Sequence, residues 1–238
     1  MSYIGVISWK ELKSYLTSPM AYVVSAVFLA ISGFSFVAYL AGTNYADTSL
    51  RGFVEAGQYL VLVFAALLTM RLVAEERRSG TWELMLTVPV TETQIVLGKF
   101  LGSLALLVGM LFLTLYYPFL LVVFGDPDVG PIVSGYLGLL LLGSAALSVG
   151  VFASSLTSSQ LVSAVVAGGV LFGLWFLGPA GAYAPEGVAG LLADISLSSH
   201  FPGFARGVID TQAVVYYLSV TALFLFLAVR SVQADRWR

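Results

Sequence analysis

The sequence lacks cysteine and is poor in charged residues. With no cysteine among its 238 residues, disulfides, thiolate metal sites and cysteine nucleophiles are excluded. Charged residues make up only 10% of the chain, whereas hydrophobic residues make up 59% and the mean hydropathy is +0.94. A soluble surface could not cover that much apolar material. We therefore predict an all-α, polytopic membrane protein. Its net charge of −2 gives no indication of a nucleic-acid partner.

Motifs for catalysis and nucleotide binding are also missing. The sequence contains no HExxH, no Gly-x-Gly-Asp and no Walker A pattern, and its apolar segments show no convergent polar residues, which would be costly in lipid. The lone His200, beside two serines and Pro202, is interpreted as an interfacial polar residue rather than a metal or proton site. We expect a non-catalytic chain that binds no cofactor or metal, so energy must come from a partner.

Six segments are long and apolar enough to cross a membrane, which takes about 20 residues per helix. They cover residues 20–42, 57–73, 95–124, 132–153, 161–177 and 213–229. These crossings leave no room for a separate soluble domain, so residues 1–238 are expected to form a single transmembrane domain. Residues 44–55 read as a polar loop. The third segment is longer than a bilayer requires, and a kink is expected near Tyr116–Pro118.

Two further segments have an amphipathic or mixed pattern. Residues 3–16 carry aromatic and aliphatic residues with lysines between them, which is typical of a helix lying in the membrane interface. The alternative is that they simply begin the first spanning helix. No removable signal peptide is expected, because a compact apolar core followed by a cleavage site is missing. Residues 178–212 are too polar for one crossing and are interpreted as a re-entrant pair or interfacial helices on the far face.

Small residues recur at four-residue spacing, which permits close approach of helices in lipid. The pairs are Gly98 with Gly102, Ser144 with Ser148, and Gly169 with Gly173. Packing within the chain is the favoured interpretation. The alternative is that one pair lines a dimer interface.

Lysine and arginine are distributed unevenly between the two faces of this topology. Nine of the eleven fall on the face that carries both termini, and only Arg51 and Arg206 fall on the other. Positively charged residues favour the cytoplasmic side. The sequence thus predicts cytoplasmic termini and an even number of crossings.

The most charged stretch of the chain runs from Leu68 to Lys99, between two apolar segments. Within it, Ser79-Gly80 can end one helix and Thr81 can cap a new short one, which Pro89 stops before Thr91 begins the next. The predicted product is a short amphipathic helix on one membrane face. Its apolar side would be a surface for docking, although a passive solvated loop is the simpler alternative.

This stretch also carries a resemblance. The string AEERRSGTWELMLTVPVT, Ala74 to Thr91, resembles the cytoplasmic loop of type-2 ABC exporter permeases, in which such a segment forms the coupling helix. Upstream, KELKSYLTSPMAYV, Lys10 to Val23, and LTMRLVAEERRSGT are similar to the branch that serves gliding motility and nitrous-oxide-reductase maturation. The chain departs from that branch at Phe64–Ala66, where a proline usually stands ahead of the LTMR string.

The resemblance implies a membrane-spanning permease subunit of an ABC exporter in a bacterial or archaeal cytoplasmic membrane. Residues 74–94 would form the coupling loop, and a separate ABC ATPase subunit would hold ATP and magnesium. The permease would act as a homodimer or heterodimer among membrane lipids, and an extracytoplasmic accessory subunit is a further candidate partner. The residues implied in ATPase docking are Glu75, Glu76, Arg77, Arg78, Gly80, Thr81, Trp82, Glu83, Leu84, Met85, Leu86 and Pro89.

Two alternatives to solute export stay open at this point. One is an ATPase-driven mechanical or assembly complex that acts on an extracytoplasmic partner without transporting a solute. The other, a channel or proton-coupled carrier, is disfavoured because the apolar segments lack carboxylates. For an exporter, the uncharged segments favour lipidic, amphipathic or peptide cargo over a small ion.

Overall fold

Helix α8, Val129–Ser155, lies at the centre of a helical bundle. The structure is a computed structural model that describes residues 3–43, 49–81, 90–125 and 127–235. Helices α3, α6, α9 and α12 pack around α8, which is buried over most of its length. Its glycines and serines make this possible: a Cβ added at Gly143 would lie 2.3 Å from Leu107 Cδ2, so the helices approach closely.

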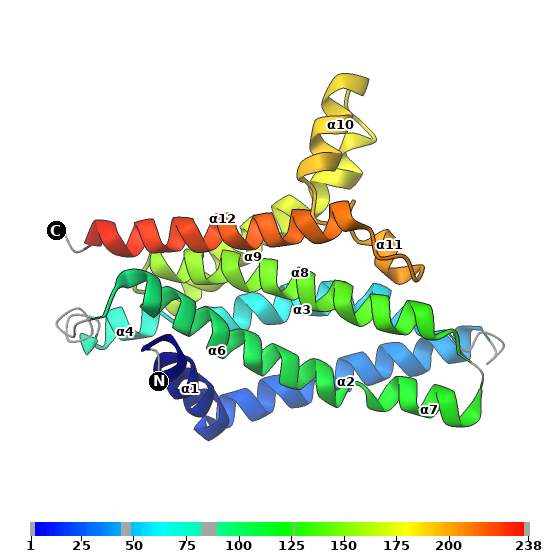
Figure 1. Ribbon diagram of the computed structural model, residues 1–238, viewed down its shortest axis with the longest axis horizontal. Helices are drawn as coiled ribbons and strands as arrows, with labels where there is room; N and C mark the ends of the chain where they lie inside the picture. The colour runs from blue at the N-terminus through cyan, green and yellow to red at the C-terminus, as the bar shows by residue number, and fades with distance from the viewer. Residues whose placement is uncertain (1–2, 44–48, 82–89, 126, 236–238) are drawn as a thin grey trace.

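The described residues are helical, apart from short connections, and contain no strand (Figure 1). The helices are α1 (Tyr3–Thr17), α2 (Pro19–Gly42), α3 (Arg51–Thr69), α4 (Ala74–Arg78), α6 (Glu92–Leu113), α7 (Tyr116–Phe124), α8, α9 (Gln160–Gly181), α10 (Glu186–Ile195), α11 (Pro202–Ala205) and α12 (Thr211–Asp235). Within these residues, six segments have the length and composition of membrane spans, namely Pro19–Gly42, Arg51–Arg78, Glu92–Phe124, Val129–Ser155, Gln160–Gly181 and Thr211–Ala234. The predicted fold class, an all-α polytopic membrane protein, is confirmed.

Helices α1 and α2 are separate, and α1 packs along α6. Ser18 is extended (φ −88°, ψ 125°) and Pro19 occupies the first turn of α2, where its missing N–H costs nothing. A Cβ added at Gly98 or Gly102 of α6 would lie 2.6 Å from the Cβ of Ile7 or Glu11 of α1. This glycine pair therefore serves packing within the chain, as predicted.

The second span begins earlier than expected. Residues 51–55 were predicted to belong to a polar loop, but α3 starts at Arg51. Leu50, Phe53 and Val54 are buried, so apolar contacts extend the helix outward while its charged residues stay exposed. The local amphipathic pattern outweighs the polar composition of this stretch.

The third span is interrupted, close to the predicted kink. A capping box between Thr91 and Gln94 starts α6, as expected for Thr91. The helix ends at Leu113, and α7 begins at Tyr116, two residues before Pro118. Proline lacks the N–H that would continue the hydrogen-bond ladder.

The two ends of the bundle differ. Helix α1, helix α4 and the C-terminal end of α12 lie at one end, which we call the basic end (Figure 1). Helix α11 lies toward the opposite end, and α10 projects away from the bundle beside the last turns of α9 (Figure 1). Residues 178–212 were predicted to be a re-entrant pair or interfacial helices. They form the last turn of α9, the whole of α10 and the whole of α11, with their connections.

Candidate functional site

At the basic end, a lysine is buried between two carboxylates. The Lys99 side chain is 1% exposed, and its Nζ lies 2.9 Å from Glu11 Oε1 and 2.8 Å from Glu76 Oε1. The same ammonium donates a hydrogen bond of 2.6 Å to the Leu72 carbonyl. A charge removed from water is tolerated when it is paired and hydrogen-bonded, and all three contacts serve that need. Lys99 of α6 therefore connects α1, α4 and the turn that precedes α4.

That turn, residues 70–73, interrupts the helical hydrogen bonds of the second span. Side chains from other helices satisfy the backbone groups that are released. The Tyr15 hydroxyl of α1 donates to the Leu68 carbonyl at 2.6 Å, and Ser154 Oγ of α8 accepts from the Val73 and Ala74 amides at 3.0 and 3.1 Å. Buried backbone groups without such partners would be costly. The interruption is thus built into the packing of three helices and needs no proline.

Arg71 joins the turn to the corner between α1 and α2. Its guanidinium carbon lies 4.5 Å from the centre of the Tyr15 ring, and Nη1 donates to Ser18 Oγ at 3.3 Å. Burial raises the pKa of the Tyr15 hydroxyl above its ordinary value, while nearby Arg71 lowers it in part. The hydroxyl is therefore neutral at physiological pH and remains a donor to the Leu68 carbonyl.

Helices α3 and α8 approach each other closely at Thr69, the last residue of α3 before the turn at residues 70–73. Thr69 Oγ1 donates to the Ala65 carbonyl at 2.7 Å, a back-bond that tends to bend helices. A Cβ added at Gly150 would lie only 1.9 Å from Thr69 Oγ1. A glycine is therefore required at this point of α8, and the α3 end is fixed against it.

Part of the predicted docking segment is described. Glu75 and Arg78 are exposed on α4, and Gly80 and Thr81 are exposed beyond its end. Gly80 adopts φ 71°, a left-handed conformation that ends the helix where the sequence indicated. Glu76 and Arg77 are less exposed, and Glu76 pairs with Lys99. The remaining predicted residues, Trp82, Glu83, Leu84, Met85, Leu86 and Pro89, lie outside the described residues. Their docking role stays a prediction.

The sequence interpretation missed a convergence of polar residues. It expected none within the apolar segments, yet Lys99 lies inside the span Glu92–Phe124 and meets Glu11 and Glu76. The available signal was a lysine between two glycines of an apolar helix, opposite an interfacial helix that contains a glutamate. Because Lys99 and Glu11 are 88 residues apart, only the packing of α1 on α6 reveals the pair.

This arrangement, which we call the junction, consists of Lys99, Glu11, Glu76, Tyr15, Arg71 and Ser154 with the turn at residues 70–73. Within the described residues, no group of three or more histidines and carboxylates could hold a metal ion. The junction is suited to transmitting a displacement between helices. It holds the segment that leads into residues 82–89 against α1, α6 and α8 by ionic and backbone contacts.

A comparison with protein families gives one match. The family described as "ABC-2 family transporter protein" matches residues 6–231, which is nearly the whole chain. A comparison with curated proteins finds no match.

Proposed function

Because the chain belongs to the ABC-2 transporter family, we propose that it is the permease subunit of an ABC exporter, driven by a separate ATPase subunit. Two permease chains, identical or different, would act together with two ATPases that hold ATP and magnesium. The basic end would face the cytoplasm, with both termini on that side, in a bacterial or archaeal cytoplasmic membrane. This chain would contribute no catalytic residue.

The observation that carries this proposal is the triple contact of Lys99. The described segment that ends at Thr81 leads directly into residues 82–89, where the ATPase is proposed to dock. Lys99 ties this segment, through Glu76, to α6 and to Glu11 of α1. A displacement of the docked residues would therefore move α1 and α6 together, because the connecting segment is fixed to both helices.

In the docked state, we expect apolar anchors surrounded by charged residues. Trp82, Leu84, Met85 and Leu86 would fill a groove of the ATPase. Exposed Glu75 and Arg78 would lie at the rim, together with Glu83. Glu76 already has a partner within the chain, so we assign it to transmission more than to recognition.

Co-purification with the ATPase tests the docking role. Leu86→Asp and Trp82→Asp each place an unpaired charge in a desolvated contact, which costs several kcal/mol of binding, roughly 2–4 by the usual interface values. Recovery of a separately tagged ATPase should fail for both. Glu75→Lys should weaken recovery only in part, since a rim ion pair contributes about 1 kcal/mol and is screened by salt.

Leu191→Asp is a matched control, because Leu191 is 61% exposed on α10, far from the basic end. This variant makes the same leucine-to-aspartate substitution as Leu86→Asp and should leave recovery of the ATPase unchanged. The amount of each variant in the membrane provides the second control. Full recovery with both Leu86→Asp and Trp82→Asp, at normal yield, would refute docking through this segment.

A mechanical or assembly role is a second candidate, of the kind served by the gliding-motility and nitrous-oxide-reductase-maturation branch. The projection of α10 favours it (Figure 1). Tyr183, Val188, Leu191 and Ile195 on and before α10 are exposed apolar residues, a surface suited to an extracytoplasmic partner protein. Loss of activity in Leu191→Asp with normal ATPase recovery would favour this role over solute export.

A further inference from the structure

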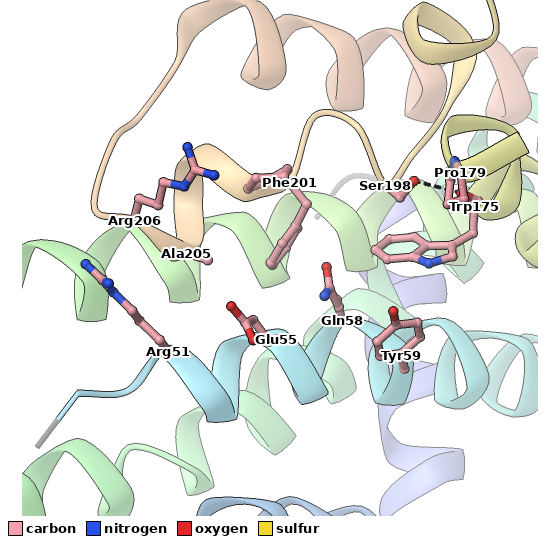
Figure 2. Close-up of a pocket in the computed structure, with 11 residues that line it drawn as sticks. Arg51, Glu55, Gln58, Tyr59, Trp175, Pro179, Ser198, Phe201, Ala205 and Arg206 are labelled. Atoms are coloured by element: carbon pink, nitrogen blue, oxygen red, sulfur yellow. Dashed lines mark hydrogen bonds between the residues drawn. The ribbon is translucent and has the colours of Figure 1, made fainter. Parts of the chain in front are cut away.

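The two basic residues at the end opposite the junction line one pocket. Arg51 at the start of α3 and Arg206 after α11 both border a cavity of about 440 Å³. Figure 2 shows them at one side of the pocket, with Trp175 at the other and Glu55 and Phe201 between them. Segments about 150 residues apart in sequence thus bring together the only two arginines assigned to this face.

We propose that this pocket binds the phosphate or carboxylate group of an anionic amphiphile, such as an acidic lipid. The inference is independent of ATPase docking, because the pocket lies at the other end of the bundle. Its volume falls within the range of small-molecule sites, roughly 300–1,000 Å³. The end of the spans is also where lipid head groups meet water.

The charge of the pocket favours an anion. Arg51, Arg206 and Glu55 are exposed, and among the described residues the guanidinium group of neither arginine forms an ion pair or a hydrogen bond. The three charges sum to plus one. Arg51 is also the first residue of α3, where the helix dipole adds positive potential. Guanidinium groups bind phosphate and carboxylate in a bidentate manner, so an oxyanion would satisfy both arginines.

The opposite wall of the pocket is aromatic. Trp175 and Tyr59 meet edge to face with ring centres 5.4 Å apart, and Phe201 lies beside them. Trp175 and Phe201 are buried, whereas Tyr59 is 47% exposed. Such a wall contacts the apolar body of a ligand, not a free ion. The combination of oxyanion donors and aromatic rings therefore selects an amphiphile.

The pocket is held in shape by a proline in α9. Pro179 has no N–H, so the Trp175 carbonyl four residues earlier has no helical donor. The hydroxyls of Ser196 and Ser198 donate to this carbonyl at 3.2 and 2.7 Å, and the Ser198 bond is drawn in Figure 2. A Cβ at Gly178 would lie within 2.8 Å of the hydroxyl oxygens of both serines. The aromatic wall is thereby fixed to the loop that precedes α11.

The side that bears Arg206 is fixed as well. Ser134 of α8 donates to the Phe204 carbonyl at 2.7 Å, and Gly138 lies against the Phe204 side chain. Gly207 adopts φ 92°, and a Cβ there would lie 3.1 Å from Pro131, so only glycine fits the turn after Arg206. The pocket is thus a preformed site.

Native mass spectrometry of the full-length chain in detergent tests the proposal. Phosphatidylglycerol, phosphatidylcholine and inorganic phosphate are titrated separately against wild type, against the double variant Arg51→Gln/Arg206→Gln, and against Arg230→Gln. Arg230 is a matched control, since it lies on α12 at the basic end. Wild type and Arg230→Gln should bind phosphatidylglycerol at least about tenfold more tightly than phosphatidylcholine, and the double variant should lose that preference.

Two further variants test the charge of the pocket and distinguish a lipid from free phosphate. Glu55→Gln removes the negative charge and should tighten phosphatidylglycerol binding. Tyr59→Ser should weaken phosphatidylglycerol binding and leave inorganic phosphate unaffected, because only the lipid reaches the aromatic wall. If inorganic phosphate binds as tightly as the lipid, the assignment of an amphiphile as the ligand is wrong. An unchanged lipid preference in the double variant, with normal thermal stability, would overturn the site.

Discussion

Lys99 shows how one residue connects three helices. Its ammonium has two carboxylates and a carbonyl within 3 Å, so its burial is compensated on every side. A hydrophobic residue of similar length would fill the same volume but would remove the cation between Glu11 and Glu76, and among the described residues Glu76 would keep only the exposed Lys10, whose Nζ lies 3.9 Å from Glu76 Oε1. A hydrophobic residue at position 99 would therefore match the volume of Lys99 but not its charge.

Lys99→Met is expected to destabilise the protein by about 3–5 kcal/mol, the usual cost of removing one member of a buried ion pair. Lys13→Met is the control, because Lys13 is an exposed lysine on α1 and should change stability little. Thermal unfolding in detergent measures both. The triple variant Lys99→Met/Glu11→Gln/Glu76→Gln should recover part of the loss, since it removes the charges along with the cation.

Equal melting temperatures for Lys99→Met and Lys13→Met would contradict the assignment of Lys99 as the buried connector. Failure of the triple variant to improve on Lys99→Met would indicate a loss of packing instead of unpaired charge.

At the scale of helices, the junction depends on donors and acceptors supplied from outside the second span. Ser154 illustrates this, since its oxygen accepts from the amides of Val73 and Ala74, and its hydroxyl donates to the Met70 carbonyl at 3.4 Å. The neighbouring Ser155 donates only to Phe152 of its own helix. Of these two adjacent serines, Ser154 therefore supports the turn at residues 70–73, whereas the Ser155 hydroxyl bonds only within α8.

Ser154→Ala is expected to cost about 1–3 kcal/mol, because it leaves the Val73 and Ala74 amides buried without an acceptor. Ser155→Ala should be nearly neutral. Hydrogen exchange of the peptide that contains residues 70–78 should become faster in the first variant and stay unchanged in the second. Equal exchange in both variants would show that the serine does not support the turn.

Much of this architecture follows from the sequence. Apolar length gives the spans, Pro19 and Thr91 give helix starts, and Gly80 gives a helix end, because each depends on local physical chemistry. The start of α3 at Arg51 and the contacts of Lys99 depend on which faces become buried. Those faces are set by helices distant in sequence. Local composition therefore gives the wrong prediction, a loop, for Arg51–Glu55, and it gives no indication that Glu11 contacts Lys99.

Across the whole molecule, α8 connects the two ends. Ser154, near its C-terminal end, supports the junction, and Ser134, near its start, supports the segment that carries Arg206. A displacement at the basic end therefore has a rigid, buried path toward the pocket. This is a spatial connection, and coupling between the ends would have to be measured as a change of lipid affinity on ATP binding.

The sidedness of the bundle gives the last prediction. Because the chain has no cysteine, a single introduced cysteine reports on its own position without background. Ser79→Cys and Ala234→Cys lie on exposed positions at the basic end, and Tyr183→Cys lies at a position that is 95% exposed before α10. If the basic end is cytoplasmic, a membrane-impermeant maleimide added to intact cells should label only Tyr183→Cys, and it should label all three after the membrane is opened. Labelling of Ser79→Cys and Ala234→Cys in intact cells would invert the orientation. Labelling of only one of these two would contradict six crossings, because an even number of spans places both on the same side.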